Sequence, residues 1–257
     1  MAPRLNASVG SPFRLDGTHA LVTGASGGIG AAIAEALAAA GARRLTLVGR
    51  DRRALGLVAR RAAARGSRAD MLVCDVTDPD ALQDAFGRVG PLDALICAAG
   101  ANVPQALDEI ELDTADRLWT LNVRAGLHAT REAVARMPAS GGVVVFISSQ
   151  MGHVGAARRS VYCATKHAIE GLTRALAVEL APRGVRVIAV APTFVLTQMT
   201  EPFLADPAFR ADVLRRIPLG RLAEPAEVAA AVVYAASPAA ASVTGCSLRV
   251  DGGWTAQ

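Results

Sequence analysis

Short apolar runs that alternate with longer alanine-rich stretches are the feature of this chain that most limits its fold. The apolar runs predict strands at residues 20–23, 45–48, 69–74, 94–97, 143–148, 186–190 and 247–250. The stretches between them predict helices at residues 29–40, 52–65, 79–86, 115–136, 161–180 and 226–235. A strand followed by a helix and another strand is the unit from which parallel sheets are built.

The first, fifth and sixth of these strands are apolar at nearly every position rather than at alternate ones. That pattern indicates strands that are buried on both faces, between two layers of helices. The sequence therefore predicts an α/β fold with a doubly wound parallel sheet. No linker divides the 257 residues. We expect one domain over residues 14–257, preceded by a flexible leader at residues 1–13.

Residues 194–221 interrupt the regular alternation. This segment contains Pro202, Pro207 and Pro218, with a short helical pattern at residues 208–216. Such a segment between regular elements is either a lid over a binding site or a plain surface loop. We expect a lid at about residues 194–221.

Charge and cysteine usage exclude several classes of function. The 27 basic and 23 acidic residues are interspersed, whereas a nucleic-acid surface needs a clustered basic stripe. No apolar run approaches the length of a membrane span. The cysteines Cys74, Cys97, Cys163 and Cys246 form no CxxC pair, so neither a zinc site nor a disulfide framework is expected. We expect no metal, no nucleic-acid or membrane partner, and a reducing, cytoplasmic setting.

A glycine-rich turn follows the first predicted strand. It reads Thr23-Gly24-Ala25-Ser26-Gly27-Gly28-Ile29-Gly30 and leads into a helix. Glycines let backbone N–H groups approach a pyrophosphate, and the helix N-terminus adds the positive end of its dipole. The strand–turn–helix context predicts a dinucleotide site that includes Gly24, Ser26, Gly28, Ile29 and Gly30.

The end of the second predicted strand bears on the choice of cofactor. An NAD site places an acidic residue about 20 positions after the glycines, but here that position is Arg50. A guanidinium suits a 2′-phosphate, so the sequence favours NADP(H), with NAD(H) as the alternative. Under that alternative Arg50 is solvated and Asp51, a possible helix N-cap, turns to the ribose. Asp75-Val76 is placed to reach the adenine, although Asp75 could equally cap the next helix.

A tyrosine and the only lysine of the chain lie four residues apart. Tyr162 and Lys166 share one face of the predicted helix. All 26 other basic residues are arginines. A neighbouring ammonium favours the phenolate and lowers the tyrosine pKa, so the pair predicts a general acid/base. The alternative without a catalytic role is that both side chains are solvated on a surface helix.

Ser149 strengthens this interpretation because it follows the apolar strand at residues 143–148. Ligands of open α/β sheets bind at the carboxyl ends of the strands. A serine hydroxyl there can hold a substrate carbonyl while the tyrosine protonates it. Ser148 is the rival serine and Ser160 a weaker one.

The glycine turn, Ser149, Tyr162-Cys163-Ala164-Thr165-Lys166 and Val250-Asp251-Gly252-Gly253 resemble the short-chain dehydrogenase/reductase family over about residues 14–257. The resemblance implies a Rossmann domain with a seven-stranded parallel sheet and a homotetramer. It also implies a catalytic tetrad, which falls on Asn122, Ser149, Tyr162 and Lys166. The implied role of Asn122 is to anchor a proton-relay water, and that of Lys166 is to lower the tyrosine pKa and bind the nicotinamide ribose. Further cofactor positions implied by the motifs are Ala99, Gly100, Pro192, Val195 and Thr197.

The chain departs from the family pattern at two places. The family's Asn-Asn-Ala-Gly reads Cys97-Ala98-Ala99-Gly100 here, which implies the loss of side-chain hydrogen bonds that brace the end of the sheet. The family's Pro-Gly reads Pro192-Thr193, which implies a narrower space beside the nicotinamide.

The substrate pocket is expected between Ser149 and Tyr162 and under the lid. Gln150, His153 and Phe194 are candidate lining residues. A structural role for His153 is the stronger alternative. Arg158-Arg159 reads first as a solvated turn, but an inward arginine would favour an anionic substrate such as a sugar acid.

The sequence thus predicts an NAD(P)-dependent oxidoreductase that moves a hydride between a nicotinamide cofactor and a carbonyl/secondary alcohol pair. The ending at residues 250–257 resembles family members that act on sugars, polyols and sugar acids, so a small substrate of that kind is expected. The alternative is a ketone or 3-oxoacyl reductase of broader range.

Overall fold

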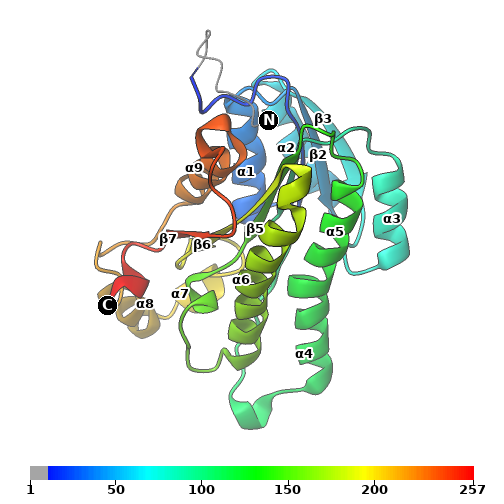
Figure 1. Ribbon diagram of the computed structural model, residues 1–257. Helices are drawn as coiled ribbons and strands as arrows, with labels where there is room; N and C mark the ends of the chain where they lie inside the picture. The colour runs from blue at the N-terminus through cyan, green and yellow to red at the C-terminus, as the bar shows by residue number, and fades with distance from the viewer. Residues whose placement is uncertain (1–10) are drawn as a thin grey trace.

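The computed structural model describes residues 11–257. These residues form a parallel sheet that lies between two layers of helices (Figure 1). Within these residues the strands are β1 (His19–Thr23), β2 (Arg44–Gly49), β3 (Arg68–Val73), β4 (Ala94–Cys97), β5 (Gly142–Ile147), β6 (Val185–Pro192) and β7 (Ser247–Val250). The α-helices are α1 (Gly28–Ala39), α2 (Arg52–Ala63), α3 (Pro79–Gly87), α4 (Leu112–Trp119), α5 (Ala125–Val134), α6 (Ser160–Leu180), α7 (Glu201–Leu204), α8 (Pro207–Arg215) and α9 (Pro225–Ala236). Short 3₁₀ turns are η1 (Leu107–Glu109), η3 (Gln150–Gly152), η4 (Ala181–Arg183), η5 (Pro238–Ala240) and η6 (Trp254–Ala256), and η2 (Thr120–Arg124) is a π turn.

The sheet is seven-stranded and parallel throughout, with the order β3-β2-β1-β4-β5-β6-β7. The chain winds outward from β1 to β3, returns to place β4 beside β1, and then winds in the other direction. Connections diverge at the β1/β4 pair, which leaves a crevice at the carboxyl ends of these strands. The predicted doubly wound fold is confirmed.

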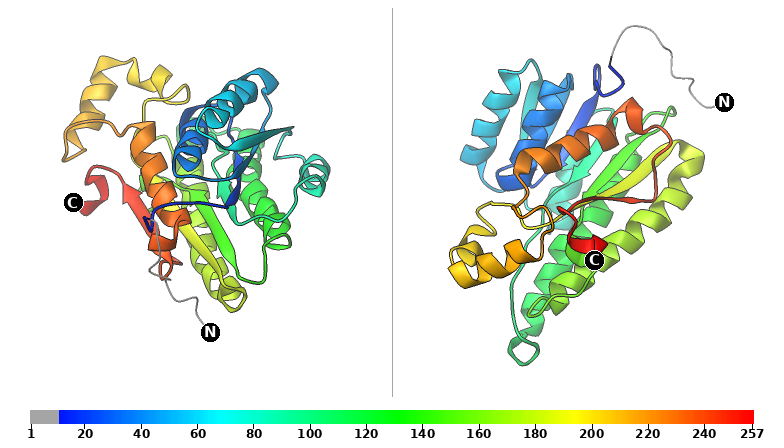
Figure 2. Two further views of the ribbon diagram at one scale, coloured as in Figure 1. Left: turned by 90° about the horizontal axis from the view of Figure 1, so that it is seen from above. Right: turned by 90° about the vertical axis from the view of Figure 1, so that its left-hand side faces the viewer.

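Successive strand residues enter two different cores, as the apolar runs predicted. In β1, Ala20 and Val22 pack with residues of α1, α2 and α9, whereas Leu21 packs with residues of α3, α5 and α6. Side chains alternate between the faces of a strand, so a strand covered on both faces needs apolar residues at every position. The two helical layers stand on opposite sides of the sheet in Figure 2.

The helix predicted at residues 115–136 differs most from the structure. It begins at Leu112, ends at Val134 and is interrupted by the π turn η2. A π turn inserts one residue into the helical ladder, and such bulges occur frequently at functional sites. The hydrophobic period does not reveal the insertion, because the flanking turns keep their apolar faces.

The predicted lid contains two helices. The expected pattern at residues 208–216 forms α8, while α7 was not predicted because it is a single turn of four residues. Of the predicted leader, residues 1–10 lie outside the described residues. Pro12 and Phe13 belong to the domain: the Pro12 carbonyl accepts a hydrogen bond from Ala239 N–H, and the Phe13 ring lies 6.3 Å from that of Tyr234.

Candidate active site

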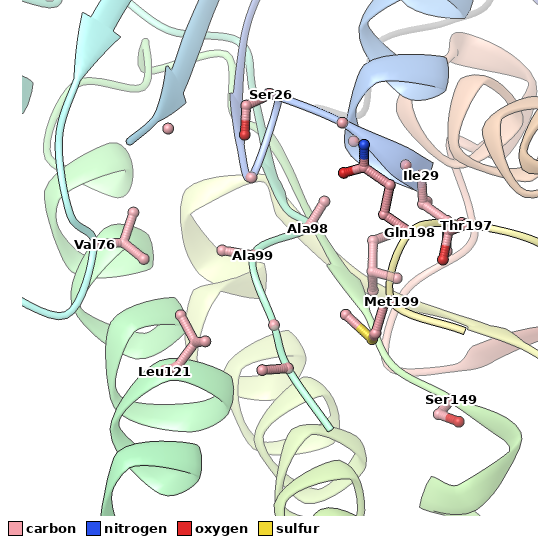
Figure 3. A pocket seen from close by; sticks show the side chains of 18 of the residues that line it. Ser26, Ile29, Val76, Ala98, Ala99, Leu121, Ser149, Thr197, Gln198 and Met199 are labelled. Carbon is pink, nitrogen blue, oxygen red and sulfur yellow. The ribbon is translucent and has the colours of Figure 1, made fainter. Parts of the chain in front are cut away.

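A cavity of about 750 Å³ opens at the carboxyl ends of the central strands. Every residue that the sequence predicted to bind the cofactor lines it. Val76 and Leu121 stand on one side of the cavity in Figure 3, and Thr197, Gln198 and Met199 on the other. Ser149 also lines the cavity. Within residues 11–257, no group of three His, Cys, Asp or Glu side chains is arranged to hold a metal ion.

The glycine turn shapes one wall of this cavity. Gly24 has φ +66°, and a Cβ there would lie 2.7 Å from the backbone nitrogen of Ala99. Gly28 has φ +53° and begins α1, whose N-cap Gly27 provides no side-chain cap. The first amide N–H groups of α1 therefore have no partner within the helix. Free amides at a helix N-terminus fit the pyrophosphate of a dinucleotide.

Arg50, which the sequence predicts to bind the 2′-phosphate of NADP(H), lines the cavity just after the end of β2. Its side chain is 79% exposed, and its Nη1 lies 3.7 Å from Oδ2 of Asp75. Asp51 caps α2 by accepting a hydrogen bond of 3.0 Å from Ala54 N–H. The interpretation in which Asp51 turns back to the ribose is therefore not supported.

Asp75 does not cap the following helix, so the alternative that gave it this role is wrong. Its Oδ1 accepts hydrogen bonds from the amide and hydroxyl of Thr77, at 2.9 and 2.7 Å. These bonds lower the pKa of Asp75 and keep its carboxylate ionised. The N-cap of α3 is Asp78. Asp75 is held instead in a turn at the cavity wall, beside Arg50.

Tyr162 and Lys166 lie one helical turn apart on α6, as their spacing predicted. The Lys166 side chain is buried, and its Nζ donates a hydrogen bond of 2.8 Å to the carbonyl of Ile147 at the end of β5. Nζ also lies 5.6 Å from the centroid of the Tyr162 ring. The lysine therefore joins α6 to the end of β5 and faces the cavity.

Burial dominates the pKa of Tyr162. It raises this pKa to about 12, while the nearby Ser149 hydroxyl and the charge of Arg159 lower it. Burial also lowers the pKa of Lys166 to about 8, and the nearby Glu170 carboxylate raises it. Desolvation disfavours the charged form of both groups and is the largest influence on each pKa.

Ser149 is better placed than the two rival serines. Its hydroxyl lies close enough to Tyr162 to lower the pKa of that tyrosine, and its Oγ accepts a hydrogen bond of 3.1 Å from Met151 N–H. Ser148 also lines the cavity, but its Oγ is buried without a hydrogen-bond partner in residues 11–257. Ser160 begins α6 and is exposed. The contact with Tyr162 singles out Ser149.

Asn122 lies in the π turn and is buried behind the cavity wall. Its Oδ1 accepts from Ala101 N–H, and its Nδ2 donates to Ala101 O, both at 2.9 Å. Nδ2 also donates to Thr165 Oγ1 at 3.1 Å. Both side-chain donors are therefore occupied, and the amide ties the segment after β4 to α6. The anchoring of a proton-relay water by Asn122 stays a prediction.

Thr23 supplies the brace that the Cys97-Ala98-Ala99-Gly100 sequence was expected to lose. Its Oγ1 accepts hydrogen bonds from the amides of Ala98 and Ala99, at 3.2 and 3.4 Å. A hydroxyl on β1 thus holds the end of β4. Thr193 is buried at the cavity, where its Oγ1 has no hydrogen-bond partner in the described residues.

Three predicted substrate residues lie away from the main cavity. Gln150 is buried in η3, and the Phe194 ring packs 5.8 Å from those of Phe209 and Trp254. His153 Nε2 contacts Ser247 Oγ at 3.1 Å and Glu170 Oε1 at 3.3 Å. Gln150, His153 and Phe194 are therefore not among the residues that line this cavity, and their contact with substrate stays a prediction.

Met199, which the sequence places in the lid segment expected to line the substrate pocket, lines the cavity beside Gln198, which the sequence did not single out (Figure 3). Thr200 holds their loop, because its hydroxyl contacts the carbonyl of Val195 and accepts from Thr197 N–H at 3.0 Å. A glutamine in a proline-rich loop carries no sequence signal for binding, so only the fold reveals Gln198.

Comparisons with known proteins agree with this site. A model of short-chain dehydrogenases and reductases, described as enoyl-(acyl carrier protein) reductase, matches residues 24–255. The chain is 38% identical over 246 residues to L-xylulose reductase from Bos taurus, covering 95% of this chain and 99% of the relative. The chain belongs to the short-chain dehydrogenase/reductase family. It is an NAD(P)-dependent oxidoreductase that acts on carbonyl/alcohol pairs.

Two further similarities involve other members of the family. Galactitol 2-dehydrogenase (L-tagatose-forming) from Cereibacter sphaeroides is 42% identical over 251 residues, covering 95% of this chain and 97% of that protein. The crystal structure of a gluconate 5-dehydrogenase from Burkholderia cenocepacia J2315, in complex with NADP and tartrate, is 31% identical with a TM-score of 0.90. The match covers 96% of this chain and 98% of that structure.

The proximity of the Ser149 hydroxyl to Tyr162 generates a prediction about pH. Alcohol oxidation needs a deprotonated base, so its rate should rise with pH toward the tyrosine pKa. Ser149→Ala removes an interaction that lowers this pKa, so the rise should move to higher pH. We also expect kcat to fall about 100-fold, as on loss of one hydrogen-bond donor to the reacting oxygen. The pH profile of kcat, with Ser149→Thr as a control that retains the hydroxyl, measures both effects. An equal loss of rate at every pH would contradict the proposed effect on Tyr162.

Proposed function

We propose that this protein is an NADP(H)-preferring dehydrogenase of small polyhydroxylated substrates: sugars, polyols or sugar acids. The observation that carries the proposal is one continuous cavity with Arg50 at one end and Ser149, Tyr162 and Lys166 at the other. The names of the relatives support the substrate class, since they include an L-xylulose reductase and a galactitol 2-dehydrogenase. A gluconate 5-dehydrogenase among the similar structures extends it to sugar acids.

The residues fit a division of labour. NADP(H), held by the glycine turn, supplies or accepts the hydride. Tyr162 exchanges a proton with the substrate oxygen, which Ser149 holds through its hydroxyl. Lys166 is fixed on Ile147 O and adds a positive charge beside the tyrosine ring. Asn122 is a positioning residue, because it fixes the backbone of Ala101 and contacts Thr165 one turn from Tyr162.

An acyl-carrier substrate, as in the 3-oxoacyl reductase alternative, has less support. A carrier would need a free basic patch near the site, and the arginines at hand in η2 and around α5 are Arg124, Arg131 and Arg136. Arg124 donates to Thr77 O at 3.3 Å, and Arg136 donates to Phe86 O at 2.9 Å. Two of these three guanidinium groups thus already bind carbonyls of this chain.

We also propose a cytoplasmic, homotetrameric enzyme. The free cysteines Cys74, Cys97, Cys163 and Cys246 fit a reducing compartment. Within residues 11–257, none of the helices is both long and apolar enough to cross a bilayer. Apolar side chains are exposed along α4, α5 and α6, including Leu112, Leu127 and Val178. Exposed apolar residues on neighbouring helices are typical of subunit contacts.

The activity is tested by oxidation of polyols, aldoses, sugar acids and simple secondary alcohols with NADP⁺. We expect turnover of at least one polyhydroxylated substrate, and a loss of about 10²- to 10⁴-fold in Tyr162→Phe because a general acid/base is removed. Retained NADP⁺ binding by this variant shows that it is folded. Turnover restricted to 3-oxoacyl thioesters in the reductive direction would contradict the substrate class.

Arg50 should set the preference between the two cofactors. Arg50→Gln is expected to lower the ratio of kcat/KM with NADP⁺ to that with NAD⁺ by about 10- to 100-fold, because a charged hydrogen bond to the 2′-phosphate is lost. Arg88→Gln is the control, since Arg88 is an exposed arginine at the C-terminus of α3. An unchanged ratio in Arg50→Gln would show that Arg50 faces solvent in the complex.

Sedimentation tests the assembly. We expect the chain to sediment with four times its monomer mass at micromolar concentration. Val178→Arg, on the exposed face of α6, should shift it toward smaller species because a charge would be buried in the contact. Leu57→Arg on α2 is the matched control. A wild-type monomer would contradict the tetramer.

A further inference from the structure

Arg159 is a buried cation without an acidic partner. Its residue is 7% exposed, and its Nε is enclosed without a hydrogen-bond partner in residues 11–257. The one hydrogen bond donated by its guanidinium there goes from Nη1 to Arg158 O, at 3.2 Å. No carboxylate of the described residues lies within 4 Å of it. Burial of an unpaired charge is costly, so a buried guanidinium calls for an anion that satisfies it.

Arg186, a half-buried arginine of the described residues, has a fuller set of acceptors than Arg159. The Arg186 guanidinium donates to the carbonyls of Ala235, Ser237 and Val243, at 2.7, 3.4 and 3.4 Å. Lys166 donates to Ile147 O. Arg159 has no comparable set of acceptors. The lack of hydrogen-bond acceptors is therefore specific to the surroundings of Arg159.

The neighbouring arginine points the other way. Arg158 is exposed and forms an ion pair of 2.8 Å with Glu109. It has φ +59°, and it is the one residue other than glycine with positive φ in the described chain. A left-handed backbone is unfavourable for a side-chain-bearing residue. This strained turn places adjacent arginines on different sides, so the expectation of a solvated Arg158-Arg159 turn is wrong for Arg159.

Arg159 lies between the catalytic helix and the predicted lid. It is the N-cap residue of α6, three positions before Tyr162. Its guanidinium carbon lies 5.3 Å from the centroid of the Phe203 ring in α7. Its charge is close enough to lower the pKa of Tyr162. A ligand beside Arg159 would therefore be held near the reacting tyrosine and under α7.

The cofactor phosphates do not account for this charge. The 2′-phosphate end of the cavity is at Arg50 and the pyrophosphate end at Gly28. Arg159 does not line this cavity; it lies at the start of α6, three positions before the lining residue Tyr162. A single guanidinium with no second free cation beside it matches a monoanion. The planar fork of arginine matches the two oxygens of a carboxylate.

We propose that Arg159 binds the carboxylate of a sugar-acid substrate and so selects aldonates over the corresponding polyols. This inference rests on the proposed function, because it specifies the substrate of the same site. The Phe203 ring covers one flat face of the guanidinium. The N–H donors lie in the guanidinium plane, so this contact leaves them for the substrate.

Matched substrate pairs test this role. The pairs are D-gluconate with D-glucitol, D-galactonate with galactitol, and D-xylonate with xylitol, each oxidised with NADP⁺. Wild type should have a higher kcat/KM for the aldonate of at least one pair. Arg159→Gln should lower the aldonate/polyol ratio of kcat/KM by about 10- to 100-fold, mostly through KM. The ratio cancels any effect that acts through the pKa of Tyr162 on both substrates.

Two further variants sharpen the experiment. Arg159→Lys keeps the charge but not the fork, so it should retain part of the ratio. Arg158→Gln, in which the exposed neighbouring arginine loses its charge, should leave the ratio unchanged. Substrate binding can also be measured without turnover, in the Tyr162→Phe variant with NADP⁺ bound. Calorimetry should show that D-gluconate binds about 10-fold or more weakly when Arg159→Gln is added to this variant. NADP⁺ binding by each variant reports that it is folded.

The outcomes separate the two proposals. Turnover of polyols with no aldonate preference, or an equal loss on both members of each pair in Arg159→Gln, overturns the role of Arg159 and leaves the proposed function standing. A preference for sugar phosphates over aldonates would contradict the proposal that Arg159 binds a carboxylate. If none of the six substrates is oxidised, the proposed substrate class is overturned. In that case calorimetry still decides Arg159: gluconate binding that is independent of Arg159 overturns its role, and dependent binding supports it.

Discussion

The close approach of Gly24 to the backbone after β4 is the contact on which the site depends. It exists because β1 and β4 are neighbours at the point where the sheet reverses its direction of winding. A side chain at Gly24 would separate the two loops that form the floor of the cavity. Thr23 reinforces the same junction through its hydrogen bonds to Ala98 and Ala99. The crevice of a doubly wound sheet thus becomes a narrow, ordered cavity.

Burial dominates the electrostatics of the catalytic residues. Tyr162 and Lys166 both have pKa values displaced toward their neutral forms, to about 12 and about 8, because each is removed from water. Glu170 and Ser149 act against these displacements. The titratable groups of the site therefore lie in a low-dielectric environment. There a hydrogen bond or an added charge changes their pKa values more than it would in water.

Structural and chemical roles are divided along α6. Its N-terminal end places Arg159 and Tyr162 at the substrate side, and Lys166 fastens the next turn to β5. Further along, Glu170 contacts His153 and Ser247, which links η3 and β7 to the helix. Asn122 adds a second attachment from the π turn through Thr165. The position of the tyrosine is thus set from several elements at once, as a preorganised site requires.

The sequence by itself determined the layered architecture, the glycine turn, the cavity-lining Arg50 and the Ser149–Tyr162–Lys166 constellation. These features are local: apolar runs specify buried strands, glycines specify the tight turn, and a spacing of four specifies a shared helix face. The tertiary structure decided the rest. It left His153, Gln150 and Phe194 outside the lining of the cavity, occupied both side-chain donors of Asn122, and buried Tyr162 so that its pKa rises. It also sent Arg158 outward and Arg159 inward, although the two are identical in type and adjacent. Side-chain direction on a turn depends on one backbone dihedral and on neighbours distant in sequence, and burial depends on the whole fold, so neither is written in a local pattern.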